Sequence, residues 1–443
     1  MSEWTRDEII RECHDKDVRF LNLQFSDIVG LVKSITLSVS QIEHVLDDGV
    51  WFDGSSIQGF ARVSESDMYL FPDLSTFAII PWSVGADKTA RLVCDVFTPD
   101  GEPFAGAPRT ALISALQEAE RLGYRYLVGP ELEFFLFETD ERGLPAVAAI
   151  HDQAGYFDAT SDRGMLVRQA MSAALEVFDI EVLTGHHEGA PGQHEIDFRY
   201  QDALKAADSA VTFKYVLKAV AQQHGLYATF MPKPIEGING SGMHVHQNLA
   251  DITTGKNLFS DPSDAYGLSK LAKHFMAGQL YHARAMSVVL APLVNSYKRL
   301  VPGYEAPVYV SWAHINRSAL IRIPRARSTE SVRLELRCPD PSCNPYLALA
   351  VMLHCGLDGI KNEMSLPDPS EEDLYEAEWA RVGLETLPGS LKEAIDAAAD
   401  SPIIQRALGP HIFERYLDAK NLEWDAYRVA VTDWELERYF RIY

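Results

Sequence analysis

Gly129-Pro130-Glu131-Leu132-Glu133-Phe134-Phe135-Leu136-Phe137 is the stretch that decides the fold. Its aromatic and aliphatic residues follow a Gly-Pro turn, which predicts a buried β-strand. Because side chains alternate across a strand, we expect Glu131 and Glu133 on the same face, about 6–7 Å apart. Two ionised carboxylates on a half-buried face repel each other and lose hydration. A positive partner is therefore expected beside them, either an arginine or a divalent cation.

The chain has 443 residues, 47% of them hydrophobic, which is enough core for two or three domains. Its net charge of −23 disfavours nucleic acids and anionic membranes as partners, so an anionic substrate needs a locally basic pocket. The N-terminus lacks a secretory-signal pattern, and the longest nearly apolar run, 285–294, is too short for a bilayer. The five cysteines are scattered. These features predict a cytoplasmic protein without a disulfide framework.

The segment 98–108 contains three prolines and two glycines, a composition typical of a connection between domains. Before it, short strand patterns dominate. After it, helices and strands mix without a strict βαβ rhythm, and the chain becomes mainly helical beyond residue 344. We predict an α+β protein with a small β-rich domain, residues 1–103, and a larger domain, residues 104–443.

Three other predicted strands carry polar side chains at every second position. The sets that share a face are Glu195, Asp197 and Arg199; His244, His246 and Asn248; and Arg333, Glu335 and Arg337. For any single strand, the solvated outer face of an antiparallel sheet is the favoured interpretation. Four strands of one domain with an acid or imidazole at the centre favour the lining of a cleft instead.

Six side chains are candidate metal ligands: Glu131, Glu133, Glu188, Glu195, His244 and Glu335. Hard oxygen ligands with one imidazole and no thiolate suit Mg²⁺ or Mn²⁺, and six are enough for more than one ion. Five arginines are candidate ligands for phosphate or carboxylate: Arg299, Arg317, Arg322, Arg333 and Arg337. This combination predicts metal-dependent phosphoryl transfer with ATP. Neither a Walker A motif nor G-x-G-x-x-G occurs, so another architecture must hold the nucleotide.

Longer motifs follow one another in a fixed order along the chain. They occupy residues 52–60 (Phe-Asp-Gly-Ser-Ser-Ile-Gln-Gly-Phe), 129–135, 186–196 (His-His-Glu-Gly-Ala-Pro-Gly-Gln-His-Glu-Ile), 239–246 (Asn-Gly-Ser-Gly-Met-His-Val-His), 295–307, 316–324 and 337–341. In content and order these motifs resemble the type I glutamine synthetases from end to end. The chain looks like the shorter alpha subgroup, which lacks the segment that is adenylylated in the other subgroup.

The resemblance implies condensation of L-glutamate with ammonia, driven by ATP through a γ-glutamyl phosphate. It implies a β-grasp-like N-terminal domain and a catalytic domain on a curved, mainly antiparallel sheet. It also implies two divalent ions per site. By position, the first ion would be held by Glu133, Glu188 and Glu195, and the second by Glu131, His244 and Glu335.

The resemblance also implies roles for other residues. The glutamate substrate would be bound by Asn239, Gly240, Arg299 and Arg337. The transferring phosphoryl group would be neutralised by Arg317 and Arg322, and the nucleotide would be contacted by Phe198, Tyr200, His246, Asn248 and Arg333. Asp53, from the neighbouring subunit, would deprotonate ammonium, and Glu305 would close over the intermediate. Arg62 would mediate feedback inhibition by glutamine.

The family assembles as a dodecamer of two hexameric rings, with active sites between subunits. Two other functions remain open from the sequence: a ligase that joins glutamate to another amine, such as a polyamine or ethanolamine, and a non-catalytic relative. The presence of Asp53 and Glu305 favours ammonia. One departure bears on nucleotide recognition, because Leu183 stands where many relatives have a glutamate. Structural roles also remain open for His246, Arg333, Phe198 and Tyr200.

Overall fold

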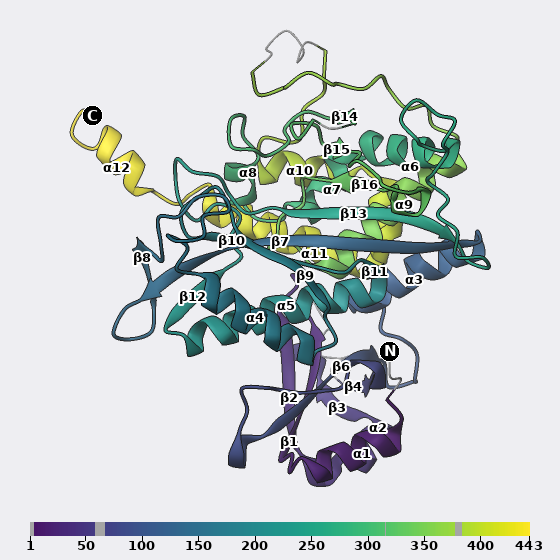
Figure 1. The fold of residues 1–443 in the computed structure, drawn as a ribbon, viewed down its shortest axis with the longest axis vertical. Helices are drawn as coiled ribbons and strands as arrows, with labels where there is room; N and C mark the ends of the chain where they lie inside the picture. Colours follow the sequence, from purple (N-terminus) through teal and green to yellow (C-terminus); the bar gives the residue numbers. More distant parts are fainter. Residues whose placement is uncertain (1–3, 58–66, 315, 377–382) are drawn as a thin grey trace.

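The computed structural model describes residues 4–57, 67–314, 316–376 and 383–443. Its smaller, N-terminal sheet has the strand order β2-β1-β6-β4-β3, and β5 pairs with β6 (Figure 1). The strands are β1 (Phe20–Ser26), β2 (Val32–Ser38), β3 (Val50–Asp53), β4 (Asp67–Pro72), β5 (Ala78–Ile79) and β6 (Thr89–Phe97). Helices α1 (Arg6–Asp15) and α2 (Ile42–Asp48) share a hydrophobic core with this sheet, in which Leu21, Leu23 and Leu92 are fully buried.

The larger sheet has the order β14-β15-β16-β13-β7-β10-β9, and β8, β11 and β12 also pair with β7. Every pairing in it is antiparallel except β14 with β15. Its strands are β7 (Tyr124–Thr139), β8 (Pro145–Ile150), β9 (Val182–His187), β10 (Gln193–Phe198), β11 (Gln201–Asp202), β12 (Leu226–Thr229), β13 (Met243–Asp251), β14 (Trp312–Ala313), β15 (Ile321–Arg322) and β16 (Leu334–Leu336). The stretch that predicted a buried strand is the middle of β7, the central strand.

Helices surround the larger sheet (Figure 1). They are α3 (Pro108–Arg121), α4 (Met165–Val177), α5 (Ala203–Gln223), α6 (Lys270–Tyr281), α7 (Ala283–Leu290), α8 (Ser296–Arg299), α9 (Pro345–Lys361), α10 (Leu391–Ala399), α11 (Pro402–Tyr427) and α12 (Asp433–Tyr439). Helix α9 is buried on nearly all sides, as expected for a helix that is apolar all round. It begins after Asn344, whose side chain caps the amides of Tyr346 and Leu347. α12 projects from the body of the chain.

Buried contacts join the N-terminal part of the chain to helices that pack on the larger sheet. Arg109 of α3 pairs with Asp73 and Asp95 of the N-terminal part at 2.6 Å and with Asp208 of α5 at 3.0 Å. The Asn344 side chain donates to the backbone carbonyl of Asp27, in the turn between β1 and β2. Because an isolated buried guanidinium is costly, the three carboxylates make this junction specific.

The predicted α+β class is confirmed, with a small sheet followed by a larger, mainly antiparallel sheet with helices. The predicted division at residues 103 and 104 falls in the connection between β6 and α3, and it stays a prediction. In the part of the chain that the structure describes, no helix combines the length and apolarity needed to cross a bilayer.

Candidate active site

The strand register brings most of the predicted ligands to one face. On β7, Glu133 lies opposite Glu195 of β10, and Glu131 lies opposite His244 of β13. On the far side of β13, His246 lies opposite Glu335 of β16. Opposed side chains in antiparallel pairs are neighbours, so three strand pairings gather acids and imidazoles from distant parts of the sequence.

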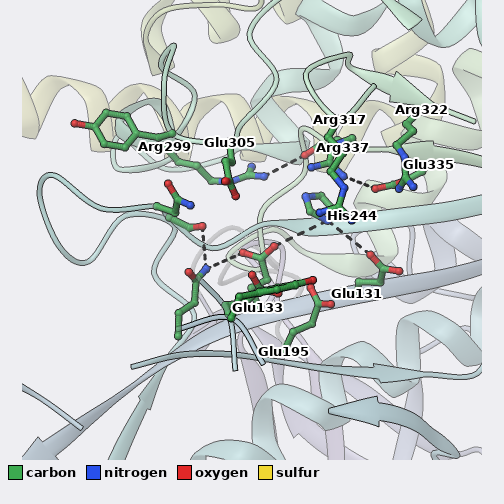
Figure 2. Close-up of a pocket in the computed structure, with 16 residues that line it drawn as sticks. Glu131, Glu133, Glu195, His244, Arg299, Glu305, Arg317, Arg322, Glu335 and Arg337 are labelled. Atoms are coloured by element: carbon green, nitrogen blue, oxygen red, sulfur yellow. Dashed lines mark hydrogen bonds and ion pairs between the residues drawn. The ribbon is translucent and has the colours of Figure 1, made fainter. Parts of the chain in front are cut away.

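Apart from His246, these side chains line a cavity of about 230 Å³ (Figure 2). Figure 2 shows the arginines and Glu305 on one side, the glutamates of β7 and β10 on the other, and His244 between them. The cavity brings together thirteen of the predicted site residues: Glu131, Glu133, Glu188, Glu195, Asn239, Gly240, His244, Arg299, Glu305, Arg317, Arg322, Glu335 and Arg337.

The three glutamates predicted to hold the first ion all have raised pKa values, because their surroundings disfavour the ionised form. Burial, with Glu188 nearby, raises the pKa of Glu133 to about 8. Burial also raises the pKa of Glu188, and burial with Asp197 and Glu133 raises the pKa of Glu195 well above its usual value. Glu133 accepts from the Gln193 side chain at 2.8 Å and from the Gly242 amide at 2.9 Å. Two buried acids and one partly buried acid thus resist ionisation together, and a divalent cation bound among them would favour their ionised forms.

The acids predicted for the second ion are compensated by the protein itself. Burial opposes ionisation of Glu335, but Arg337 and His246 lower its pKa to about 2. Its two oxygens accept from Arg322 and Arg337, each at 2.5 Å. Burial likewise opposes ionisation of Glu131, but His246, at 2.6 Å, and His244 hold its pKa well below the usual value. Nearby positive groups therefore favour the ionised form of both carboxyl groups, the form that can bind a cation.

Several groups of side chains have ligand atoms within 4.8 Å of one another. Around the cavity these groups are Glu131, His246 and Glu335; Glu131, Glu195 and His244; and His186, Glu188 and Glu195. They contain five of the six predicted ligands, together with His186 and His246. The exact division of the six ligands between two ions stays a prediction.

A second pocket, of about 280 Å³ and mostly apolar, adjoins the cavity through Glu131, which lines both. All five residues predicted to contact nucleotide line this pocket: Phe198, Tyr200, His246, Asn248 and Arg333. Leu183 lines it too. Arg333 donates to the Nδ1 of His246 at 3.2 Å, while His246 Nε2 meets Glu131. An apolar pocket with a few fixed polar groups is typical of a small-molecule site.

Three sequence predictions lie elsewhere. Asp53 is exposed at the end of β3 in the N-terminal sheet and does not line its own chain's cavity. Arg62 lies outside the described residues. Arg199 was expected beside Glu195 and Asp197, which is wrong: β10 ends at Phe198 after a register shift, and Arg199 pairs with Glu181 at 3.0 Å.

Three cavity residues were missed: Tyr156, Gln193 and Tyr304. Gln193 shares its strand face with Glu195 and links Glu133 to the Gly240 carbonyl, so the period-two pattern could have found it. Tyr304 precedes Glu305, whose φ of 54° is rare for a residue with a side chain. Tyr156 lies in a loop with no local signal.

Two family models match the chain. One, described as "Glutamine synthetase, catalytic domain", matches residues 105–439, and "Glutamine synthetase, beta-Grasp domain" matches residues 17–99. The chain belongs to the glutamine synthetase family. The predicted β-grasp character of the N-terminal sheet is thereby confirmed.

Curated members of the glutamine synthetase family match over the whole chain. A glutamine synthetase from Clostridium saccharobutylicum is 51% identical and covers 100% of both chains. One from Methanosarcina mazei is 50% identical, with 98% of this chain and 97% of the relative covered. Among solved structures, a GmaS/ADP complex superposes with a TM-score of 0.88 and 31% identity, covering 98% of this chain and 99% of that one.

Proposed function

We propose that the protein condenses L-glutamate with ammonia to L-glutamine, using ATP and forming a γ-glutamyl phosphate intermediate. The observation that carries this function is the cavity in which acids of β7 and β10 face arginines across His244, beside an apolar pocket. Curated relatives about half identical over the full chain carry the name glutamine synthetase. They favour ammonia over a polyamine or ethanolamine as the acceptor.

We propose Mg²⁺ or Mn²⁺ as the cofactor, with two or more ions per site. The residues present fit such ions, because the donors are carboxylates with imidazole, and in the first set burial and mutual repulsion still outweigh the nearby positive groups and raise the pKa values. Glu133, Glu188 and Glu195 would hold the first ion, and Glu131, His244 and Glu335 the second. When bound, the ions neutralise charge on the ATP phosphates and on the developing acyl phosphate.

The metal-free protein is expected to become less stable as the pH rises, and bound Mg²⁺ is expected to oppose this loss of stability. The folded pKa of Glu133 lies above its unfolded value, so ionisation is harder in the folded state. Unfolding temperatures of the metal-free protein should therefore fall as the pH rises from about 5 to about 8. Mg²⁺ should raise them, and more so at higher pH. Thermal scans at several pH values, in a chelator and in Mg²⁺, measure the pH dependence of the unfolding temperature and the stabilisation by Mg²⁺. Glu133→Gln should reduce both. A metal-free unfolding temperature that rises across this window would contradict the assignment.

Glutamate would be recognised at the arginine end of the cavity. Arg299 is buried, and its guanidinium donates to the backbone carbonyls of Arg337, Cys338 and Pro339. These bonds fix its orientation, and its charge lies close enough to Glu133 to favour ionisation of that carboxyl group. Together with Arg337, Asn239 and Gly240, it would orient the substrate so that the γ-carboxylate faces the phosphate donor.

ATP would occupy the apolar pocket, with its phosphates directed toward Glu131. Tyr200 and Phe198 would contact the base, and His246, Asn248 and Arg333 the ribose and phosphates. A solved relative is described as a complex with ADP, which supports a nucleotide site in this fold. Arg317 and Arg322 would neutralise the transferring phosphoryl group.

Glu305 would close the cavity over the intermediate, because an acyl phosphate hydrolyses when water reaches it. Its positive φ stores backbone strain in a segment that would move. Asp53 would accept the proton from ammonium. Since Asp53 lies in the N-terminal sheet, away from its own chain's cavity, a neighbouring subunit would supply it.

We propose a homo-oligomer, as a dodecamer of two hexameric rings, in the cytoplasm, without nucleic-acid or membrane partners. The exposed apolar side chains of the C-terminal segment support association: Val429, Val431, Trp434, Leu436, Phe440 and Ile442.

We also propose that residues 1–103 and 104–443 form two domains. The chain would belong to the alpha subgroup, which is not adenylylated, and glutamine would exert feedback control through Arg62.

ATP-dependent phosphate release with glutamate and Mg²⁺ tests the proposed function. Ammonium is compared with a panel of amines that includes ethanolamine and polyamines, and products are identified by mass. We expect turnover with ammonium and a product of glutamine mass. Turnover with a larger amine only would assign a glutamate–amine ligase, and no turnover would leave a non-catalytic relative.

A further inference from the structure

A buried polar cluster lies behind the proposed metal ligands and outside the cavity lining. Its members Asp152, His187 and His194 are at most 4% exposed. His187 of β9 and His194 of β10 lie opposite each other, with ring centroids 4.7 Å apart. Each histidine immediately precedes a cavity residue, Glu188 or Glu195. The cluster is therefore connected to two proposed ligands through the backbone.

Asp152 accepts hydrogen bonds from both ends of the turn between β9 and β10. Its Oδ1 accepts from His187 Nε2 at 2.8 Å and from the Gly192 amide at 3.1 Å. Its Oδ2 accepts from the Arg163 amide at 3.1 Å. On the other side of the ring, His187 Nδ1 lies 2.6 Å from the Glu188 carbonyl. A carboxylate and a carbonyl are both acceptors, so both ring nitrogens of His187 donate.

Other contacts also restrict the backbone conformation of the β9–β10 turn. The Glu188 amide donates to the Gln193 carbonyl at 2.8 Å. Gly192 has a φ of 65°, and a Cβ there would lie 2.4 Å from Ile150 Cγ2. The same turn carries Gln193, whose side chain donates to Glu133. One short segment thus sets the positions of Glu188 and Glu195 directly and of Glu133 through Gln193.

The cluster could be taken for a metal site, because its three members have ligand atoms within 4.8 Å of one another. Its hydrogen bonds argue otherwise. His194 Nδ1 accepts from Arg168 at 2.8 Å, which leaves the ring proton on Nε2. Arg168 is in turn paired with Asp162 at 2.5 Å. A protonated Nε2 offers no lone pair to a metal, and both nitrogens of His187 are occupied.

We propose that Asp152 and His187 are positioning residues, which hold the β9–β10 turn so that Glu188 and Glu195 converge on one cation. This inference rests on the metal-dependent function proposed above. Partners that orient metal ligands from behind typically change metal affinity about 10–100-fold when they are replaced.

Asp152→Asn tests the proposal. It keeps the side-chain shape but removes the charge opposite His187 and places an amide donor against either the Arg163 amide or the donors at Oδ1. Mn²⁺ binding, followed by electron paramagnetic resonance of the full-length protein, should weaken about tenfold or more at one class of sites. Excess Mn²⁺ should restore most of kcat, while KM for ATP stays unchanged.

The matched control is Asp358→Asn. It breaks another His–Asp pair, in which His282 Nε2, between α6 and α7, lies 2.8 Å from Asp358 Oδ2 of α9, and neither residue lines the cavity. This control should bind Mn²⁺ as the parent does. A second variant, His187→Gln, should weaken Mn²⁺ binding like Asp152→Asn, and it decides the question if Asp152→Asn does not fold.

Parent-like Mn²⁺ affinity in a folded Asp152→Asn or His187→Gln protein would overturn the positioning role. Equal weakening in the Asp358→Asn control would overturn it as well, as would a tightly bound zinc ion in the parent that Asp152→Asn loses. If the parent itself binds no Mn²⁺, the metal-dependent function fails first, and this result is distinguishable because it needs no variant.

Discussion

Glu335→Gln is expected to lower kcat for glutamine formation about a thousandfold, an effect typical of losing a group that organises transition-state charge. Glu335 is 1% exposed and holds Arg322 and Arg337 at 2.5 Å while presenting a proposed metal ligand to the cavity. Glutamine keeps the shape but removes the charge that orients both arginines. Phosphate release at saturating Mg²⁺, ATP, glutamate and ammonium measures the loss.

The same substitution should also destabilise the fold, because it leaves the buried Arg337 without its carboxylate. Breaking one partner of a buried ion pair typically costs about 3–5 kcal/mol, and urea unfolding measures it. Glu141→Gln, in an exposed turn, is the control for charge removal and should leave both activity and stability unchanged. Activity of Glu335→Gln within tenfold of the parent would contradict the assigned role.

Local patterns predicted much of what builds the site. The Gly-Pro turn and the aromatic run predicted the middle of β7, and period two placed Glu131 and Glu133 on one face. The mainly helical pattern beyond residue 344 predicted the start of α9. These features depend on neighbours within a few residues, and short-range sterics and capping determine them.

What could not be predicted from pattern depends on register between distant strands. The sequence alone does not say that Glu131 lies opposite His244, nor that His246 from the same strand face approaches Glu131 to 2.6 Å. The bulge at Asp197 and Phe198 moved Arg199 out of the face that strict alternation predicts. The cluster of Asp152 with His187 joins residues 35 positions apart, and no local pattern marks it.

Asp53→Asn is expected to lower kcat/KM for ammonium about 10²–10⁴-fold, the range for loss of a general base. The amide cannot accept the ammonium proton, but its oxygen can still accept from the Ser55 amide and hydroxyl, as Asp53 does at 2.9 and 2.6 Å. Local structure is therefore preserved. Mn²⁺ and ATP binding should remain parent-like, since Asp53 lines neither pocket of its own chain. Full activity with ammonium would contradict the assigned role.

Mixing the two variants tests whether neighbouring subunits share each site. Oligomers of either variant alone are expected to be nearly inactive. Every site lacks Asp53 in the Asp53→Asn oligomer and lacks Glu335 in the Glu335→Gln oligomer. In co-expressed mixed oligomers, a site is intact when one subunit supplies Asp53 and its neighbour supplies Glu335. With equal amounts and random assembly, about a quarter of the sites should regain activity. Sites built within one chain could never combine the two intact halves, so mixed oligomers without activity would refute the shared site.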